Sequence, residues 1–330
     1  MMKISIIVPM YQVEQYLAIC LKSITDQTMT DGVECILVDD CGSDRSLFIA
    51  KDFIEHYQGN VLFRIVEREK NGGLSAARNS GIDVASGEYV YFLDSDDEIT
   101  PNCLEIMWSL VEKYGKVNLV QGAFFEDEKY ANSISNIKFP EFCTCQAEIK
   151  TFLLQYLGDI VGAQSRLINL SFLKEHHLYF EEGIIHEDNL WTFFLSKYVR
   201  TMAYCDVCTY YHRYNPNSIT GNVNVIKETI AYKHIIQTCS RSIDPFLIGI
   251  QKEWLLNNLI TVINSKYYVK DADLKEMLSN FKSICSFTEK LLLSLYLMLS
   301  NSALKNKMLH LLPQFGIVQA TNPSCLLYFP

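Results

Sequence analysis

The chain has 330 residues, a length that predicts one large domain with a further region appended to it. Apolar residues make up 49% and charged residues 20% of the sequence, which argues against a disordered chain. The formal net charge of −9 argues against general binding to nucleic acid, because such binding depends on Lys and Arg side chains that neutralise phosphates.

The first 125 residues alternate between strand-like and helix-like patterns. Short apolar runs typical of buried strands lie at 4–8, 35–38, 61–66, 89–93 and 117–123. Helical patterns lie between them, at 17–24, 47–57, 74–84 and 101–114. This alternation predicts an α/β fold with a doubly wound, mostly parallel sheet, which binds ligands beyond the carboxyl ends of its strands.

The cysteines and the apolar runs indicate the cellular setting. There are 11 cysteines, mostly within apolar runs, and we interpret them as reduced core residues of a cytosolic protein. Cys205 and Cys208 form a CxxC pair, but no second pair completes the four ligands of a zinc site. No secretory leader is evident at the start of the chain. Residues 291–299 are too short to span a bilayer, and we favour a buried helix over one on a membrane surface.

Three carboxylates, Asp94, Asp96 and Asp97, lie within four residues at the end of the fourth strand pattern. Because they repel one another, a cation or a helix start is expected beside them. In an extended backbone Asp94 and Asp96 point the same way, so one could accept a sugar hydroxyl and the other bind Mg²⁺ or Mn²⁺. The alternative is that Asp96 or Asp97 caps the helix near Pro101. Capping accounts for one carboxylate but not for three, so we favour the cation.

Polar residues that follow the other strands predict a nucleotide site. Asp39 and Asp40 could accept the N–H groups of a base, and Tyr11, after the stiffening Pro9, could stack against it. Arg78, in a helix that follows a glycine pair, could meet a diphosphate. Neither a GxGxxG motif nor a Walker lysine motif is present, so the sequence lacks the fingerprints of dinucleotide and P-loop sites.

Four motifs occur in a familiar order: Val8-Pro9-Met10-Tyr11, Val38 to Asp44, Asn71 to Gly81, and Phe92 to Asp97. Together they resemble the family 2 glycosyltransferases, which have the GT-A fold and use nucleotide diphosphate-sugars. The resemblance covers about residues 3–220. One departure is Cys41, where the family usually carries glycine or another small residue.

The resemblance implies roles for the residues after the strands. Asp39 would bind uracil, with Asp40 beside it. Asp94 would touch the ribose or the sugar, with Ser95 also at the donor, and Asp96 would be the metal ligand of the DxD motif.

The segment from Tyr210 to Thr220 resembles the part of the family that closes over the donor. Arg213 and Ser218 could hold the diphosphate there, since Arg matches phosphate oxygens with two hydrogen bonds. His212 is a second candidate metal ligand, although a histidine beside tyrosines is more often only hydrogen-bonded.

Glu187 and Asp188 resemble the Glu-Asp pair that supplies the family's catalytic base. We expect Asp188 to take the acceptor proton and Glu187 to support it, in a single displacement that inverts the anomeric centre. The alternative is that Glu187 and Asp188 only cap the following helix, where the positive end favours negative side chains; capping and catalysis are compatible.

We therefore expect an inverting, metal-dependent glycosyltransferase with a GT-A domain at 1–222 and a helical region at 223–330. The donor half is at about 1–125 and the acceptor half at about 126–222. A UDP-sugar is the expected donor, Mn²⁺ or Mg²⁺ the cofactor, and a sugar or lipid-linked saccharide the acceptor.

The resemblance also implies a role in bacterial surface polysaccharide or glycolipid synthesis, in the cytoplasm. A lipid-linked acceptor would bring peripheral contact with the inner face of the cytoplasmic membrane. Two alternatives are a sugar nucleotidyltransferase and a non-catalytic nucleotide-sugar-binding scaffold. A nucleotidyltransferase should carry a Gly-rich basic loop after the first strand, and this sequence has none there. The intact Asp94, Asp96 and Asp188 argue against a non-catalytic scaffold.

Overall fold

The computed structural model describes residues 1–126, 139–156, 162–213, 215, 218, 225–243, 255 and 271–283. The chain forms two compact units. The first comprises Met1–Ile149, Gly162–Gly183 and Tyr198–Asn222, and the second comprises Lys150–Val161, Ile184–Lys197 and Val223–Pro330. The predicted division of the chain at residue 222 stays a prediction.

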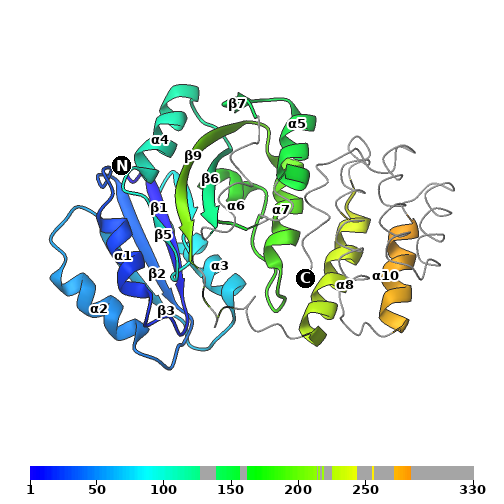
Figure 1. The fold of residues 1–330 in the computed structure, drawn as a ribbon, viewed down its shortest axis with the longest axis horizontal. Helices are drawn as coiled ribbons and strands as arrows, with labels where there is room; N and C mark the ends of the chain where they lie inside the picture. Colours follow the sequence, from blue (N-terminus) through cyan, green and yellow to red (C-terminus); the bar gives the residue numbers. More distant parts are fainter. Residues whose placement is uncertain are drawn as a thin grey trace. The chain divides into compact units, whose positions relative to one another are not determined.

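A nine-stranded sheet organises the described part of the first unit (Figure 1). Its strands are β1 Ile4–Met10, β2 Val33–Asp39, β3 Leu62–Glu67, β4 Tyr89–Phe92, β5 Glu98–Ile99, β6 Leu119–Glu126, β7 Phe142–Cys143, β8 Arg166–Asn169 and β9 Met202–His212. Their order is β3-β2-β1-β4-β8-β6-β9-β5, with β7 paired to β9. The first four strands are parallel, whereas β8 runs antiparallel to both β4 and β6.

Helices cover both faces of the parallel strands. Figure 1 shows α1 and α2 on one side of β1, β2 and β3, and α3 on the other. The described helices are α1 Leu17–Thr25, α2 Ser46–His56, α3 Leu74–Val84, α4 Cys103–Tyr114, α5 Gln146–Thr151 with a π-helical turn at Phe152–Tyr156, α6 Leu170–Glu175, α7 Glu187–Tyr198, α8 Val225–Arg241 and α10 Asp271–Ser283. The predicted α/β fold, with helices on both faces of a sheet whose first four strands are parallel, is therefore confirmed.

The core explains why the first strands read as unbroken apolar runs. Every residue of β1 and β2 is buried, because both faces of the sheet are covered. Cys20, Cys35 and Cys103 are fully buried, as expected. Helix α3 approaches β1 closely: a β-carbon added to Gly81 would lie 2.4 Å from Ile7 Cγ2. Glycine at this position therefore brings α3 against the sheet.

The sequence pattern locates β1, β2, β3, β4 and β6, and it misses β5, β7, β8 and β9. β8 has only four residues, too few for a periodic pattern to stand out. β9 has 11 residues, but its mixed burial gives neither a buried run nor a clean alternation. The four parallel strands β1 to β4 are thus evident in the sequence, whereas β6 is the one strand of the mixed half that the sequence analysis located.

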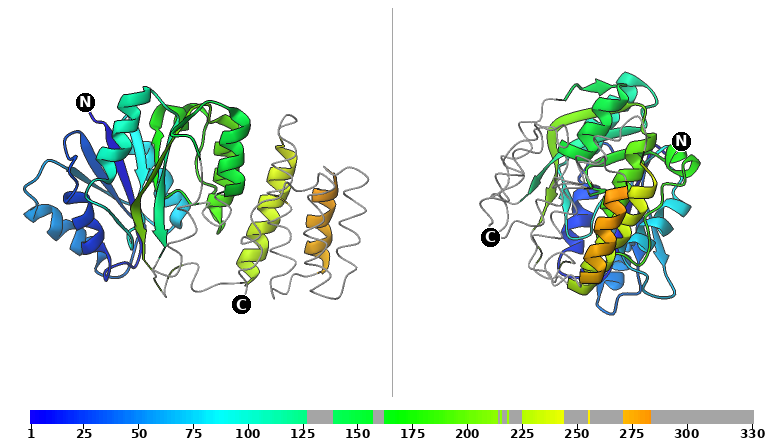
Figure 2. Two further views of the ribbon diagram at one scale, coloured as in Figure 1. Left: turned by 45° about the horizontal axis from the view of Figure 1, so that its top comes forward. Right: turned by 90° about the vertical axis from the view of Figure 1, so that its right-hand side faces the viewer.

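The second unit contains α7, α8 and α10 among its described residues. Helices α8 and α10 lie side by side in Figures 1 and 2, and Lys233 Nζ on α8 pairs with Glu276 Oε2 on α10 at 2.7 Å. The apolar stretch at 291–299 lies outside the described residues. No described helix combines the length and apolar character needed to cross a bilayer.

Candidate functional site

The carboxyl ends of β1, β2 and β4 meet at one edge of the sheet. β1 pairs in parallel with β2 on one side and β4 on the other, and the strand order reverses between β1 and β4. Open α/β sheets bind ligands beyond such a reversal. The topology therefore brings Tyr11, Asp39, Asp40 and the segment from Asp94 to Asp97 to this edge, where a ligand is expected.

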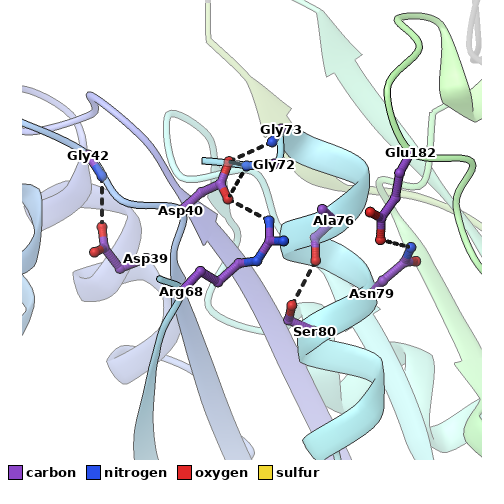
Figure 3. Close-up of polar contacts among 10 residues, drawn as sticks. All are labelled: Asp39, Asp40, Gly42, Arg68, Gly72, Gly73, Ala76, Asn79, Ser80 and Glu182. Atoms are coloured by element: carbon purple, nitrogen blue, oxygen red, sulfur yellow. Dashed lines mark hydrogen bonds and ion pairs between the residues drawn. The ribbon is translucent and has the colours of Figure 1, made fainter. Parts of the chain in front are cut away.

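Asp40 is a buried carboxylate whose oxygens accept donors from within the fold (Figure 3). Arg68 Nη1 donates to Oδ1 at 2.6 Å, and the backbone N–H groups of Gly72 and Gly73 donate at 3.0 and 2.7 Å. Gly73 has a φ of +84°, a left-handed conformation that favours glycine. Asp40 thus ties the end of β2 to the turn before α3. Its predicted place beside the uracil stays a prediction.

Asp39 is buried beside Asp40 but has fewer donors. Its Oδ1 accepts one long hydrogen bond of 3.4 Å, from the backbone N–H of Gly42 (Figure 3). Burial raises the pKa of Asp39; the charges of Glu67 and Asp40 add to the rise, and the Gly42 N–H opposes it. The carboxylate retains acceptor capacity that a base N–H could use, but its contact with uracil stays a prediction.

Three further residues that were predicted to bind the nucleotide-sugar donor differ in exposure. Pro9 is buried within β1, and Tyr11, just beyond the strand, is 46% exposed, so its ring is accessible for stacking. Ser95 is only 4% exposed and is enclosed by protein. Their contacts with the donor stay predictions, and the burial of Ser95 argues for a structural part in the turn.

Two side chains hold the carboxylate of Asp94. Arg78 Nη2 donates to Oδ1 at 2.9 Å, and Gln164 Nε2 donates to Oδ2 at 2.7 Å. Arg78 is fully buried, and its guanidinium also lies over the Phe180 ring, 5.1 Å from the centroid. In this structure Arg78 orients Asp94, and its contact with a diphosphate stays a prediction. No sequence pattern marks Gln164, which lies two residues before β8.

Asn79, in the same motif as Arg78, anchors the chain after α6. Its Nδ2 donates to the Phe180 carbonyl at 2.9 Å, and its Oδ1 accepts the Phe180 N–H at 2.9 Å. Asn79 Nδ2 also contacts Glu182 Oε1 at 3.3 Å (Figure 3). The motif after the glycine pair thus contributes two positioning residues, of which the sequence analysis singled out only Arg78.

The residues from Asp94 to Asp97 form a turn, in which the Asp97 N–H donates to the Asp94 carbonyl at 3.0 Å. The expectation of an extended backbone was therefore wrong. Even so, Asp94 and Asp96 are both half-buried, while Ser95 and Asp97 are buried. The capping alternative is also wrong, because the N-cap of α4 is Asn102 and no side chain caps that helix.

Asp97 anchors the end of β9 from a buried position. Tyr210 Oη donates to its Oδ2 at 2.5 Å, and the Arg213 backbone N–H donates to its Oδ1 at 2.9 Å. Burial and the charges of Asp94 and Asp96 raise the pKa of Asp97 to about 8, against the opposing effect of these two donors. Asp97 therefore acts as a structural link between the turn and β9.

Asp96 is the half-buried carboxylate of the turn whose oxygens are least occupied. Its Oδ2 accepts one side-chain hydrogen bond of 2.8 Å, from Asn215 Nδ2, and the backbone N–H of Asp96 itself also stabilises the charged carboxylate. Burial raises the pKa of Asp96 and the charge of Asp94 adds to the rise, whereas Asn215 and His212 oppose it. Asp96 thus lies close to the negative charge of Asp94, and its carboxylate can accept a further ligand such as a cation.

The segment after β9 returns to the same turn. Arg213 Nη2 pairs with Glu98 Oε1 at 2.6 Å, and the Ser218 N–H donates to the Asn215 carbonyl at 3.1 Å. His212 is exposed. Arg213 and Ser218 were predicted at the diphosphate and His212 at the metal, and these roles stay predictions. Asn215, which binds Asp96, is a site residue that the sequence analysis did not select.

Glu187 and Asp188 lie in the first turn of α7, where the positive end of the helix favours negative side chains. Glu187 is 7% exposed and Asp188 is half-buried, so Asp188 is the more accessible of the two. This difference agrees with Asp188 as the group that meets an acceptor and Glu187 as its support, which stay predictions.

The carboxylates at this edge of the sheet fit a divalent cation that is bound together with a diphosphate. Within the described ranges, no cluster of three or more His, Cys, Asp or Glu side chains is arranged to hold a metal ion. Mg²⁺ and Mn²⁺ bound with a diphosphate need only one or two carboxylates, because phosphate and water oxygens complete the shell. Asp96 fits this requirement, and a cation would relieve the charge that raises its pKa.

The sequence profile described as "Glycosyl transferase family 2" matches residues 5–176, more than half of the chain. The chain belongs to glycosyltransferase family 2. The match includes the turns after β1, β2 and β4, and it ends before Glu187 and Asp188.

Two curated relatives of this family 2 chain are bacterial proteins. The glycosyltransferase GlyG of Streptococcus pneumoniae is 33% identical over 156 residues, which cover 47% of this chain and 50% of GlyG. The putative glycosyltransferase EpsH of Bacillus subtilis is 30% identical over 223 residues, which cover 66% of this chain and 62% of EpsH. The chain thus spans about half to three fifths of the length of these relatives.

Solved structures confirm the fold of the family 2 chain. Staphylococcus aureus TarS 1–349 in complex with UDP-GlcNAc aligns with a TM-score of 0.68 at 22% identity, over 86% of this chain and 80% of TarS 1–349. The mannosyltransferase PcManGT of Pyrobaculum calidifontis, in complex with GDP-Man and Mn²⁺, aligns with a TM-score of 0.56 at 14% identity, over 94% and 85% of the two chains. At these identities the likeness establishes the fold alone.

Proposed function

We propose that this chain is an inverting glycosyltransferase that moves a sugar from a UDP-sugar to an acceptor hydroxyl with the help of Mn²⁺ or Mg²⁺. The observation that carries the proposal is Asp96, a half-buried carboxylate at the ligand-binding edge of the sheet, with a raised pKa and one hydrogen-bond donor from Asn215. Complexes of TarS with UDP-GlcNAc and with UDP support UDP as the nucleotide of the donor.

The donor would lie across the ends of β1, β2 and β4. Asp39 would accept a base N–H while the exposed ring of Tyr11 stacks on the base. Asp94, held by Arg78 and Gln164, is preorganised to accept a ribose or sugar hydroxyl. Asp96 would hold the cation, which when bound neutralises the charge that develops on the departing diphosphate.

The acceptor would be activated by Asp188. As the acceptor oxygen attacks the anomeric carbon, the Asp188 carboxylate would take its proton, and Glu187 would support it from a buried position. The bond from the anomeric carbon to the diphosphate oxygen breaks in the same displacement, so no enzyme nucleophile is needed and the configuration inverts. The position of both carboxylates in the first turn of α7 favours their negative charge.

Relatives suggest the class of acceptor. Among them are the minor teichoic acid biosynthesis protein GgaB of Bacillus subtilis, and the poly(ribitol-phosphate) beta-glucosyltransferase of Bacillus spizizenii, which is 39% identical over 123 residues. We therefore place the acceptor hydroxyl on a bacterial surface polysaccharide, a teichoic acid or a lipid-linked precursor. The reaction would take place in the cytoplasm, at the inner face of the membrane where the acceptor is lipid-linked.

A donor screen tests the proposal. UDP release would be measured with UDP-glucose, UDP-galactose and UDP-N-acetylglucosamine in the presence of Mn²⁺, for the wild-type protein and for Asp188→Asn. We expect release from at least one donor, and a fall of about 100-fold or more in the variant. A wild-type protein that releases no UDP would contradict the donor assignment, and an Asp188→Asn variant with normal release would contradict the base assignment.

A further inference from the structure

Next to the predicted base, a histidine contacts a buried glutamate of the C-terminal helical region. His186, directly before α7, has its Nε2 3.3 Å from Glu228 Oε1 in the first turn of α8. Glu228 is 7% exposed, and its second oxygen, Oε2, is buried with no hydrogen-bond partner in the described part of the chain. A buried carboxylate with so little compensation is costly, so it calls for an explanation other than stability.

His186 combines an uncommon backbone conformation with a ring that packs on α8. His186 has a φ of +58°, a left-handed value that is uncommon for a residue with a side chain. Its ring packs against Tyr232, with centroids 4.9 Å apart. Tyr232 is one turn along α8 from Glu228, so both side chains lie on the same face of the helix. One face of α8 thus holds both the ring nitrogen and the ring plane of His186.

A second contact joins α7 and α8 at their other ends. Lys197 Nζ, in the last turn of α7, donates to the Ser242 carbonyl just beyond α8 at 2.8 Å. The two helices therefore run in the same direction, braced at the start by His186 and Glu228 and at the end by Lys197. The two contacts differ in one respect: the His186–Glu228 contact adjoins Glu187 and Asp188, and the Lys197–Ser242 contact does not.

We propose that Glu228 is a positioning residue for the transfer reaction, acting through His186 on the first turn of α7. The proposal rests on the proposed function, because it takes Asp188 as the base. His186 carries the constraint along the chain: its carbonyl accepts the Asn189 N–H at 3.1 Å, so Glu187 and Asp188 lie within the loop that this bond closes. The C-terminal helical region, outside the family 2 match, would thereby set the direction of the catalytic carboxylate.

Three variants of the full-length chain test the proposal. Glu228→Leu removes the acceptor of the contact, Glu228→Gln retains an oxygen that can accept from His186, and Lys197→Met breaks the brace at the other end. The substrate is the UDP-sugar that gives the fastest UDP release in the donor screen. We expect Glu228→Leu to lower kcat by about tenfold or more, with KM for the donor and the Mn²⁺-dependent affinity for UDP unchanged. Glu228→Gln should retain most of the activity. Lys197→Met should leave kcat unchanged, although its Tm should fall by about as much as that of Glu228→Leu.

A readout without substrate separates this inference from the proposed function. Hydrogen exchange at the Asn189 amide should accelerate in Glu228→Leu but not in Lys197→Met, whether or not a donor is known. Unchanged exchange, or an equal effect in both variants, would overturn the positioning role. A Glu228→Gln variant as inactive as Glu228→Leu would also overturn it, because the carboxylate itself would then be required. Normal activity in Asp188→Asn would refute the base assignment. The exchange rate of the Asn189 amide would then decide by itself whether Glu228 constrains the first turn of α7 through His186.

Discussion

The acidic segments after β2 and β4, which flank β1 in the sheet, receive different partners from the fold. Asp40, after β2, is matched by the Arg68 guanidinium and two backbone N–H groups. Within the described residues, neither Asp96 nor Asp97, after β4, pairs with Lys or Arg, and their pKa values are raised. The contrast is therefore between Asp40, whose charge the fold neutralises, and Asp96, whose charge a bound cation could neutralise. Asp97 is a structural link held by Tyr210 and the Arg213 N–H.

The largest effect is expected at Asp96. Asp96→Asn removes a negative charge that burial and Asp94 disfavour, so the metal-free protein should be at least as stable as the wild type. Transfer should fall by about 1,000-fold, because the cation that neutralises the diphosphate loses its protein ligand. Thermal unfolding in EDTA and UDP release with Mn²⁺ check the two halves of this prediction. Loss of stability together with activity would assign Asp96 to the same class as Asp40.

Asp40 should show the opposite behaviour. Asp40→Ala leaves Arg68 without its buried partner and two N–H groups without an acceptor, so the free energy of unfolding should fall by about 3 kcal/mol. Urea unfolding measures the change, and the folded fraction should retain Mn²⁺-dependent UDP binding. Asp26→Ala is the matched control: it breaks an exposed ion pair with Lys22 and should cost about 0.5 kcal/mol or less.

Gln164 should have a smaller, purely functional effect. Gln164→Leu keeps the size of the side chain but removes the donor to Asp94 Oδ2, so Asp94 would be held by Arg78 alone among the partners described. We expect kcat/KM to fall about tenfold with little change in Tm. Steady-state kinetics with the preferred UDP-sugar provide the measurement, and a variant with wild-type kcat/KM would show that Arg78 suffices.

The smallest effect is expected at Tyr210. Tyr210→Phe removes the hydroxyl that donates to Asp97 and accepts the Asp94 N–H. The free energy of unfolding should fall by about 1 kcal/mol, because Asp97 keeps the Arg213 N–H as a donor. Chemical denaturation tests this value, and a loss as large as that of Asp40→Ala would remove the distinction between the two segments.

The sequence predicts the parallel half of the fold and the acidic residues of the site, but not the partners that orient them. Buried parallel strands have continuous apolar runs, and Asp39, Asp40, Asp94 and Asp96 follow those strands in recognisable motifs. Gln164 and Asn215 lie far along the chain from Asp94 and Asp96. Gln164 lies outside the motifs of the sequence analysis, and Asn215 lies within the segment from Tyr210 to Thr220, where nothing in the sequence marks it as the partner of Asp96. Likewise, only the three-dimensional contacts separate Asp40, which is matched by Arg68, from Asp39, which is not.

Calorimetric titration with UDP, in Mn²⁺ and in EDTA, addresses the central claim most directly. The wild-type protein should bind UDP at least about tenfold more tightly with Mn²⁺, and Asp96→Asn should lose that difference while Asp40→Ala, where folded, keeps it. Equal affinity of the wild-type protein in Mn²⁺ and in EDTA would contradict the assignment of the turn after β4 as a cation-dependent nucleotide site.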